Sequence, residues 1–279
     1  MRQVARKQFI LWTENYPQQS GMTPDYHTHT NYSDGISSHH SYLNQASYAC
    51  IDELGFSDHF SILDSKWSVK AEEIQQMQNH ILTIKNMEEL PVRIRFGAEI
   101  DFIPGQEKNI QALIQNLPLD YVIGSVHFLN SWNFDTDPQN FEGRNIDELY
   151  DQYFNIVRRS INSKLYDIIG HIDLIKKFGH YPCHDPSRWH KKLIRSLKQT
   201  NSVVEVNTSG LNKPCKEFYP DANFITLCFH SNIPVTLGSD AHEANQIGQY
   251  FPLAKEVLKK IGYRQVATFH KRIRKMEAL

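Results

Sequence analysis

Two histidines one residue apart, His27 and His29, stand in a segment that is predicted to end a β-strand. Alternate side chains of a strand leave on the same face, so the two imidazoles point together while Thr28 points away. Paired imidazoles on one face suit a shared metal ion. The alternative is a solvated pair without a ligand, and the rest of the chain decides between the two interpretations.

Further histidine and carboxylate side chains recur at the ends of later predicted strands and in the first turn. Each of them alone has a structural explanation, because a single histidine can bond to backbone and an aspartate can shape a turn. Their recurrence is the stronger signal and favours one shared centre. The nine candidate ligands are His27, His29, Asp34, His59, Glu99, His127, His171, Asp240 and His242.

Nine side chains are too many for one ion. A mixture of imidazole and carboxylate ligands suits Zn, Mn or Fe, and a carboxylate such as Glu99 can bridge two cations about 3.5 to 4 Å apart. The sequence therefore predicts two or three divalent metal ions.

The elements that must position these residues alternate along the chain. Predicted strands cover residues 24–30, 53–59, 92–99, 121–127, 168–171, 203–207 and 234–242. Predicted helices cover about 38–50, 70–89, 106–116, 146–162, 187–199, 221–231 and 244–261. Seven strands that alternate with helices indicate a parallel α/β fold. Because ligand-type residues follow several strands, a closed barrel with its active site at the C-terminal strand ends is favoured over an open sheet.

Composition narrows the class of protein. The chain has 279 residues, 40% of them hydrophobic, and a formal charge of −1, so no net field draws it to nucleic acid or anionic lipid. No apolar run approaches the roughly 20 residues of a membrane span. Four cysteines without CxxC spacing are interpreted as reduced and structural. Residues 1–21 are predicted to be an N-terminal extension or to precede a start at Met22, with no secretory signal, so a cytoplasmic location is expected.

Six separated segments, in order, resemble the polymerase and histidinol phosphatase (PHP) superfamily. They are residues 25–29 (DYHTH), 57–59 (SDH), 97–99 (GAE), 124–127 (GSVH), 170–173 (GHID) and 238–242 (GSDAH). The resemblance implies a distorted (β/α)7 barrel over residues 22–279, with a trinuclear metal site whose nine ligands fall on the residues given above.

Within that superfamily, residues 171–178, 205–214 and 262–269 look most like the histidinol-phosphatase branch. The resemblance implies hydrolysis of a small phosphate monoester, with L-histidinol phosphate as the leading substrate. The turn Asn31–Gly35 instead resembles the general superfamily turn, which leaves the substrate open but not the metal site. Two alternatives to this function stay open. One is a phosphoesterase acting on a nucleotide or an oligonucleotide end, and the other is a noncatalytic metal-stabilised module. The latter predicts lost ligands, and all nine positions carry a competent one.

Residues around the proposed site take further expected roles. Asp240, His242 or a bound water is expected to protonate the leaving oxygen. The predicted substrate-binding residues are Lys213, Asn207, Arg158 and Arg159. Asp58 and Asp173 are expected to hold ligand imidazoles, and Ser239 to orient ligands or substrate. His180 and His184 flank a loop near the predicted site and are interpreted mainly as surface residues.

Overall fold

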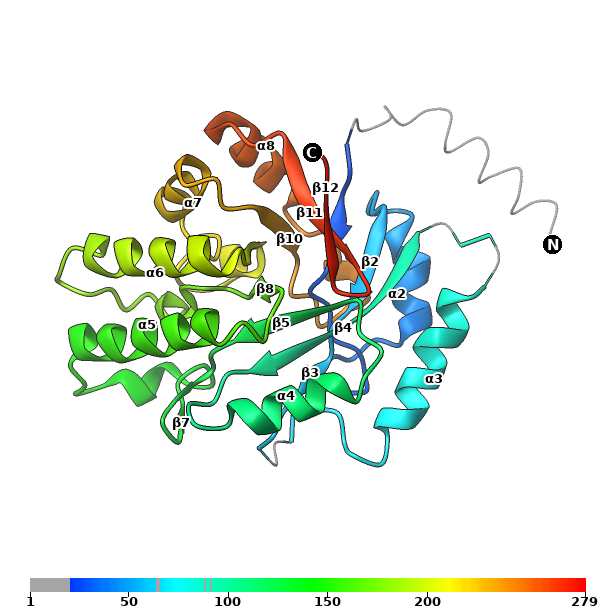
Figure 1. The fold of residues 1–279 in the computed structure, drawn as a ribbon, viewed down its shortest axis with the longest axis horizontal. Coiled ribbons are helices and arrows are strands. Elements are labelled where there is room, and N and C mark those ends of the chain that lie inside the picture. The colour runs from blue at the N-terminus through cyan, green and yellow to red at the C-terminus, as the bar shows by residue number, and fades with distance from the viewer. Residues whose placement is uncertain (1–20, 64–65, 88, 91) are drawn as a thin grey trace.

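The structure is a computed structural model that describes residues 21–63, 66–87, 89–90 and 92–279 (Figure 1). The predicted N-terminal extension, residues 1–21, lies outside the described residues except for its last position.

A parallel sheet forms the centre of the molecule. Its strands follow the order β1 (Pro24–Asp25), β2 (Glu53–Phe56), β4 (Arg93–Asp101), β5 (Tyr121–Ser125), β8 (Ile168–Ile169), β9 (Val203–Asn207) and β10 (Val235–Gly238). A short additional strand, β3 (His59–Phe60), pairs with the C-terminal half of β4. Each of the seven strands lies inside a predicted one apart from the last two residues of β4, and the predicted (β/α)7 barrel is confirmed.

The first and last strands of the sheet meet and close the ring. Thr28 and Ala241 form a parallel bridge, the Tyr26 amide donates to the Leu237 carbonyl, and the His29 amide donates to the Ala241 carbonyl. Closure therefore places the His27–His29 segment directly beside the segment that follows β10.

Helices surround this sheet (Figure 1). They are α2 (His39–Ala46), α3 (Ile74–Lys85), α4 (Glu107–Gln115), α5 (Ile146–Ser163), α6 (Ser187–Thr200), α7 (Ala222–His230) and α8 (Phe251–Ile261). Helix α5 forms where apolar spacing predicts it. The Asn145 side chain caps its first turn, and buried Tyr153, Val157 and Ile161 recur at four-residue spacing.

Three predicted helices are wrong in their extent. Helix α2 ends at Ala46 instead of about residue 50, and α3 covers Ile74–Lys85 instead of 70–89. The last predicted helix is divided. Residues 244–261 divide into a 3₁₀ turn, η4 (Ala244–Gln246), and helix α8. Between them, Gly248 has φ 63° and Tyr250 has φ 59°, both in the left-handed region. A left-handed residue cannot continue a right-handed helix, so the chain turns before α8 begins.

Two hairpins were not predicted. The first, β6 (Phe128–Leu129) with β7 (Trp132–Asn133), follows β5 at the C-terminal end of the barrel. The second, β11 (Gln265–His270) with β12 (Ile273–Ala278), covers the opposite end. Its Phe269 and Ala267 pack with Tyr26, Tyr121 and other residues of the barrel interior.

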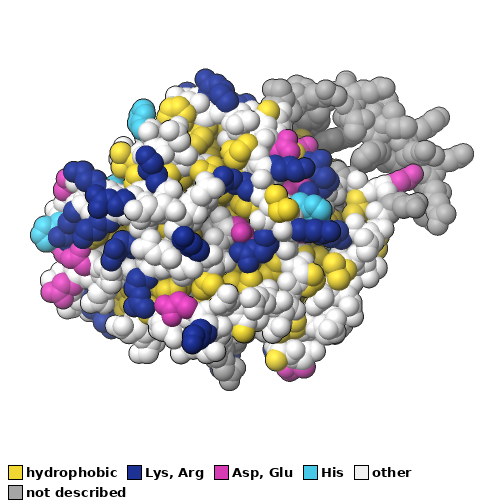
Figure 2. All heavy atoms as spheres, viewed as in Figure 1, with side chains coloured by type: hydrophobic (Ala, Val, Ile, Leu, Met, Phe, Trp, Pro, Cys, Tyr) yellow, Lys and Arg dark blue, Asp and Glu magenta, His cyan; other side chains and the backbone are white. Residues whose placement is uncertain are grey.

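The surface agrees with the composition. Figure 2 shows Lys and Arg side chains spread among polar and apolar ones over the face that carries the second hairpin. In the part of the chain that the structure describes, no helix is long and apolar enough to cross a membrane.

Candidate metal centre

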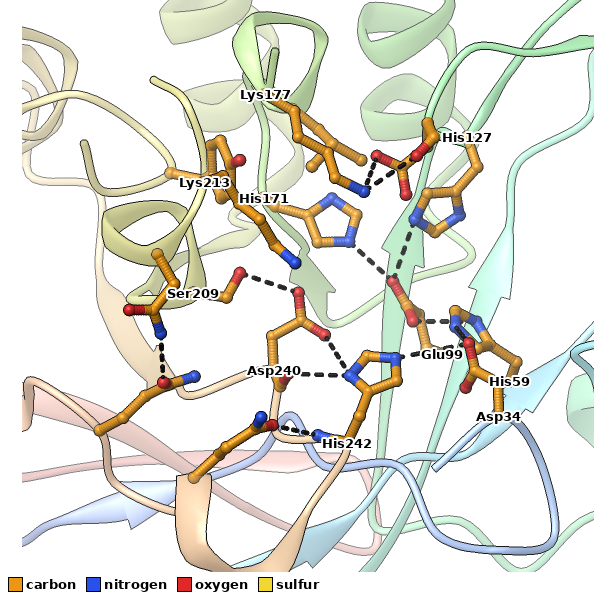
Figure 3. A pocket seen from close by; sticks show the side chains of 16 residues that line it. Asp34, His59, Glu99, His127, His171, Lys177, Ser209, Lys213, Asp240 and His242 are labelled. Atoms are coloured by element: carbon orange, nitrogen blue, oxygen red, sulfur yellow. Dashed lines mark hydrogen bonds and ion pairs between the residues drawn. The ribbon is translucent and has the colours of Figure 1, made fainter. Parts of the chain in front are cut away.

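The nine predicted ligands converge at the C-terminal end of the barrel. Figure 3 shows those that line the pocket, which are all except His27 and His29. They form four overlapping groups, within each of which one ligand atom per residue lies within 4.8 Å of the others. The groups are His27 with His29 and Glu99; His27 with His171 and Asp240; Glu99 with His127 and His171; and His29 with Asp34, His59 and His242. Shared members join the four groups into one cluster.

Glu99 lies at the middle of the cluster. It points inward from β4, and its carboxylate oxygens lie 2.9 Å from His171 Nε2, 3.0 Å from His59 Nδ1 and 3.1 Å from His27 Nε2. These imidazoles come from three other strand ends. A fully buried carboxylate among imidazoles from several strands has the placement of a bridging ligand.

The donor set fits divalent metal ions. His29 is fully buried, and neither of its ring nitrogens has a hydrogen-bond partner, although Asp240 and Glu99 oxygens lie 3.3 and 3.5 Å from its Nε2. His27 Nε2 is likewise buried without a hydrogen bond of good geometry, 3.1 Å from a Glu99 oxygen. A buried polar atom left without a partner costs about 1–3 kcal/mol, so lone pairs directed into a cluster of carboxylates call for a cation.

The pKa values of the two histidines in the first segment, His27 and His29, are shifted in opposite directions. Burial opposes protonation of His27, but Glu205, Glu99 and Asp240 outweigh it and raise the pKa of His27 well above its ordinary value. Burial lowers the pKa of His29 to about 3, with the neighbouring histidines His59 and His242 adding to the effect. Clustered carboxylates thus create a negative field that favours cations.

Asp240, a candidate ligand, also has an unusual backbone conformation. Its φ of 53° is in the left-handed region, which is uncommon for a residue other than glycine. Its carboxylate accepts hydrogen bonds from Ser209 Oγ at 3.1 Å and Asn207 Nδ2 at 3.4 Å. Backbone strain held in place by side-chain bonds is typical of functional positions.

The carboxylates that hold ligand imidazoles differ from those expected. Asp101 Oδ1 lies 2.8 Å from His127 Nδ1 and raises the pKa of His127 to about 10 against the opposing effect of burial. Glu205 Oε1 lies 2.6 Å from His27 Nδ1. Sequence reasoning missed both, although Asp101 follows Glu99 by two residues and therefore shares its face of β4.

The residues expected in that role do something else. Asp58 accepts hydrogen bonds from the Thr30 amide and from Ser33 Oγ, both at 2.6 Å, and so shapes the turn that carries Asp34. Asp173 pairs with Lys176 at 2.8 Å. Ser239, which was expected to orient ligands or substrate, donates from its Oγ to the carbonyl of the candidate ligand His27 at 3.4 Å.

A pocket of about 310 Å³ opens over the cluster. Beyond the ligands, its lining includes Asp135, Lys177, Ser209, Asn212, Lys213 and Tyr219. Lys213 extends towards Asp240 and His171, whereas Lys177 Nζ lies 2.7 Å from Asp135 Oδ1 (Figure 3). Two ammonium groups therefore lie beside a centre suited to cations, which favours an anionic ligand.

Of the four predicted substrate-binding residues, Lys213 lines the pocket and Asn207 lies beneath it against Asp240. Arg158 and Arg159 do not reach it. Arg158 lines a separate small depression between α5 and α6, and Arg159 Nη2 contacts Glu107 at 3.4 Å. Both project from the outer side of α5, which faces away from the barrel.

Sequence reasoning missed Lys177 and Asp135. Lys177 follows the His171 motif by six residues, and only the folding back of that loop brings it to the pocket. His180 stacks on Phe141, and His184 pairs with Asp147 at 2.7 Å, in agreement with their interpretation as packing and surface residues.

Known proteins and a family model match most of this chain. A family model described as PHP domain matches residues 25–209. A probable histidinol-phosphatase of Deinococcus radiodurans is 32% identical over 238 residues, which are 83% of this chain and 90% of that protein. A histidinol-phosphatase of Lactococcus lactis is 24% identical, over 88% of this chain and 93% of that protein.

Solved structures resemble the fold. A crystal structure of the Lactococcus lactis histidinol phosphate phosphatase, complexed with zinc, L-histidinol and phosphate, superposes with a TM-score of 0.79 at 21% identity. The match covers 91% of this chain and 98% of that one. A structure from Listeria monocytogenes described as a putative histidinol phosphatase gives a TM-score of 0.75 at 22% identity, over 83% and 99% of the two chains.

Proposed function

The chain belongs to the PHP domain family, and from this premise we propose that it is a metal-dependent phosphoric monoester hydrolase whose substrate is L-histidinol phosphate. The observation that carries the proposal is the pocket itself. All nine ligand-type side chains lie in or beneath a single cavity that also presents Lys213 and Lys177.

The four groups of ligands would hold two or three divalent ions, with Glu99 shared between groups. When bound, such ions supply a hydroxide-like nucleophile at neutral pH and offset the negative charge of a phosphoryl group. The relatives named histidinol-phosphatase support zinc or a similar metal in this role.

The protein's own groups then bind and orient the ester. Lys213 is placed to pair with a phosphoryl oxygen, because its side chain enters the pocket beside Asp240 and His171 (Figure 3). Asp240, held by Ser209 and Asn207, and His242, whose side chain is 39% exposed, are the groups that we propose for proton transfer to the departing alkoxide.

The remainder of the substrate carries an ammonium group and an imidazole. Asp135 supplies a carboxylate at the pocket wall, and Asn212, Gln246 and Gln249 supply polar side chains. A pocket near the lower end of the roughly 300–1,000 Å³ range of small-molecule sites suits a compact, polar ester.

The decisive experiment measures phosphate release by protein loaded with Mn or Zn, before and after chelation. L-histidinol phosphate, a nucleoside monophosphate and a generic aryl phosphate are compared. We expect chelator-sensitive turnover with a clear preference for L-histidinol phosphate. Preference for the nucleotide would transfer the protein to another phosphoesterase class, and no turnover of any ester would favour a noncatalytic module.

A variant pair tests the assignment of the centre. His27→Ala is expected to lower both metal content and activity, whereas Arg158→Ala, on the outer side of α5, is expected to change neither. Unchanged metal content and activity in His27→Ala would contradict the assigned ligands.

We further propose that residues 22–279 form the barrel domain and that the protein is cytoplasmic. All four cysteines are unpaired, which supports a reducing compartment.

A further inference from the structure

Glu205 is a buried carboxylate whose contacts extend beyond the one with His27 described above. It points from β9 into the barrel and is 1% exposed. Its Oε1 lies 2.6 Å from His27 Nδ1, and its Oε2 accepts hydrogen bonds from the His171 amide at 2.8 Å and from Asn207 Nδ2 at 3.1 Å. One side chain thus contacts two predicted ligands that follow two other strands.

The neighbouring strands leave room for this carboxylate. On β10, a Cβ at Gly238 would lie 2.0 Å from Glu205 Oε1 and 2.8 Å from the His27 Cβ. After β8, a Cβ at Gly170 would clash with Ile123 and Ser125 and would only touch Glu205 Oε2, at 3.6 Å, so the space for the carboxylate depends on Gly238. A side chain at Gly238 would therefore displace Glu205 or His27. The absence of a side chain at this position is what allows the Glu205 carboxylate to contact His27.

The contact sets the tautomer of His27. An ionised carboxylate only accepts hydrogen bonds, so His27 Nδ1 must carry the proton that it donates to Glu205. With a metal ion bound in place of the second proton, the Nε2 lone pair would face the cluster, where Glu99 and Asp240 oxygens lie 3.1 and 3.6 Å away. A carboxylate behind a ligand imidazole also makes that imidazole a stronger ligand.

A second group of ligands has no contact with Glu205. Asp34, His59 and His242 lie at the more exposed side of the cluster, and His242 Nδ1 lies 3.0 Å from the Asp240 backbone carbonyl. Any effect of Glu205 should therefore be confined to the inner ligands, His27 and His171.

We infer that Glu205 is a positioning residue that fixes His27 as the Nδ1–H tautomer and secures the inner metal ion. The inference rests on the metal-dependent function proposed above. It distinguishes an inner ion, supported by Glu205, from an outer ion held by Asp34, His59 and His242.

The test replaces the carboxylate by an amide of the same shape, whose single oxygen can accept either from His27 or from the His171 amide and Asn207, but not from both sides. In Zn-loaded Glu205→Gln, the metal content per chain and the affinity, measured by competition with a chromogenic chelator, are compared with the wild type. We expect the tightly bound metal to fall by about one equivalent, with affinity at that position weakened about 10–100-fold. Nitrogen-15 NMR of the histidine rings should show loss of the Nδ1–H form of His27.

Glu53→Gln is the matched control. Glu53 is equally buried but lies on β2 at the opposite end of the barrel, where it pairs with Arg95 at 2.8 Å and with Tyr26. That variant should lose stability and keep its metal. Glu205→Asp serves if the amide variant does not fold, since the shorter carboxylate keeps the charge and withdraws from His27, and it should also release the inner ion.

The inference fails if Glu205→Gln and Glu205→Asp retain every equivalent of metal at wild-type affinity, or if metal is lost from all positions together. These readouts are independent of the substrate. A wild-type protein that binds metal and hydrolyses no phosphate ester would remove the proposed function and leave the role of Glu205 standing. A wild-type protein that binds no divalent metal would overturn both.

Discussion

Position in the fold, rather than charge, decides which basic residues can meet a substrate. Lys213 enters the pocket, whereas Arg158 lies between α5 and α6 with its Nη2 bonded to Asn155. From the sequence alone, a basic side chain on an amphipathic helix and one that follows a strand are both possible phosphate-binding groups. Only the second lies at the end of the barrel where the ligand residues gather.

Replacing the pocket lysine should impair substrate recognition. Lys213→Ala is expected to lower kcat/KM for L-histidinol phosphate about 10- to 100-fold, because a charged hydrogen bond contributes about 1.5–3 kcal/mol. Arg158→Ala should stay within about twofold of the wild type. Steady-state kinetics of the metal-loaded proteins measure both, and a larger loss in Arg158→Ala than in Lys213→Ala would reverse the assignment.

A histidine outside the metal centre makes stability depend on pH. His39 is fully buried against Phe56 and His80, with ring centroids at 4.5 and 4.9 Å, and Tyr32 lies 5.4 Å away. Burial lowers the pKa of His39 to about 3, and the nearby imidazoles of His80 and His40 add to the effect. In the unfolded chain His39 binds a proton with a pKa of about 6.5, whereas in the folded protein it stays neutral until the pH falls to about 3.

Stability should therefore be complete above pH 6.5 and decline as the pH falls towards 3. Well below pH 6.5, His39 contributes a slope of about 1.4 kcal/mol per pH unit. His39→Leu should lose that part of the slope, and the exposed His230→Leu should keep it. Urea unfolding between pH 5 and 7 measures the difference, and parallel curves for the wild type and His39→Leu would contradict the prediction.

The candidate metal ligands could be proposed from the sequence because their signals are local. A two-residue repeat places His27 and His29 on one face, and a polar residue at the end of an apolar strand is visible without knowing what lies opposite. Glu205 and Asp101 gave no comparable signal as supporting residues. Their roles depend on His27 and His127, which reach them only through the curvature of the closed sheet.

At the scale of elements, a buried lysine joins the two loops that flank the pocket. Lys176 Nζ contacts Asp173 and Glu217 carboxylates and the Phe218 carbonyl, each at 2.8 Å. Asp173 belongs to the loop after β8, which also carries Lys177, while Glu217 and Phe218 belong to the loop after β9, which carries Lys213. The distance between the two pocket lysines thus depends on Lys176.

Removing this lysine should destabilise the protein and disturb the pocket. Lys176→Met leaves the Asp173 carboxylate buried without its partner, a change that typically costs 3–5 kcal/mol, so we expect a loss of about that size and a higher KM. The double variant Asp173→Asn with Lys176→Met should recover part of the stability. Denaturant unfolding and steady-state kinetics provide the two readouts.

The adjacent lysine is a matched control. Lys177 pairs with Asp135 at the partly exposed pocket wall, and such pairs contribute about 0–1 kcal/mol. Lys177→Met should therefore leave stability nearly unchanged. Equal losses of stability in Lys176→Met and Lys177→Met would show that the buried pair does not join the loops.

Elements were predictable where one face is buried and were missed where burial is partial. Apolar spacing located α5 and α6 to within one residue at each end. Strand β12 pairs only with β11 and leaves Ile273 67% exposed, so its sequence shows no clear apolar face. The turn before α8 was missed because the apolar spacing continues across it and the residue directly before the helix, Tyr250, is not a glycine, although Gly248 occupies a left-handed position two residues earlier.

For the whole molecule, the join that closes the barrel lies at the candidate metal centre. Strand β1 has two residues, and its join to β10 depends on the Thr28–Ala241 bridge and a few adjacent hydrogen bonds. By contrast, β4 and β5 pair over five residues. His27 and His29 stand on one side of this join and Asp240 and His242 on the other, so ions bound by both sides would hold the barrel closed.

Metal removal should therefore open the barrel locally before it unfolds. A ligand that binds only the folded state at about 100 times its Kd adds about 2.7 kcal/mol of stability, and here that contribution acts across one join. On chelation we expect faster hydrogen exchange in residues 24–30 and 235–242, with little change in β4 and β5. Hydrogen-exchange mass spectrometry of chelated and zinc-reloaded protein measures this, with reloading as the control for irreversible damage. Exchange that rises equally in every strand, or in none, would show that the ions do not hold β1 to β10.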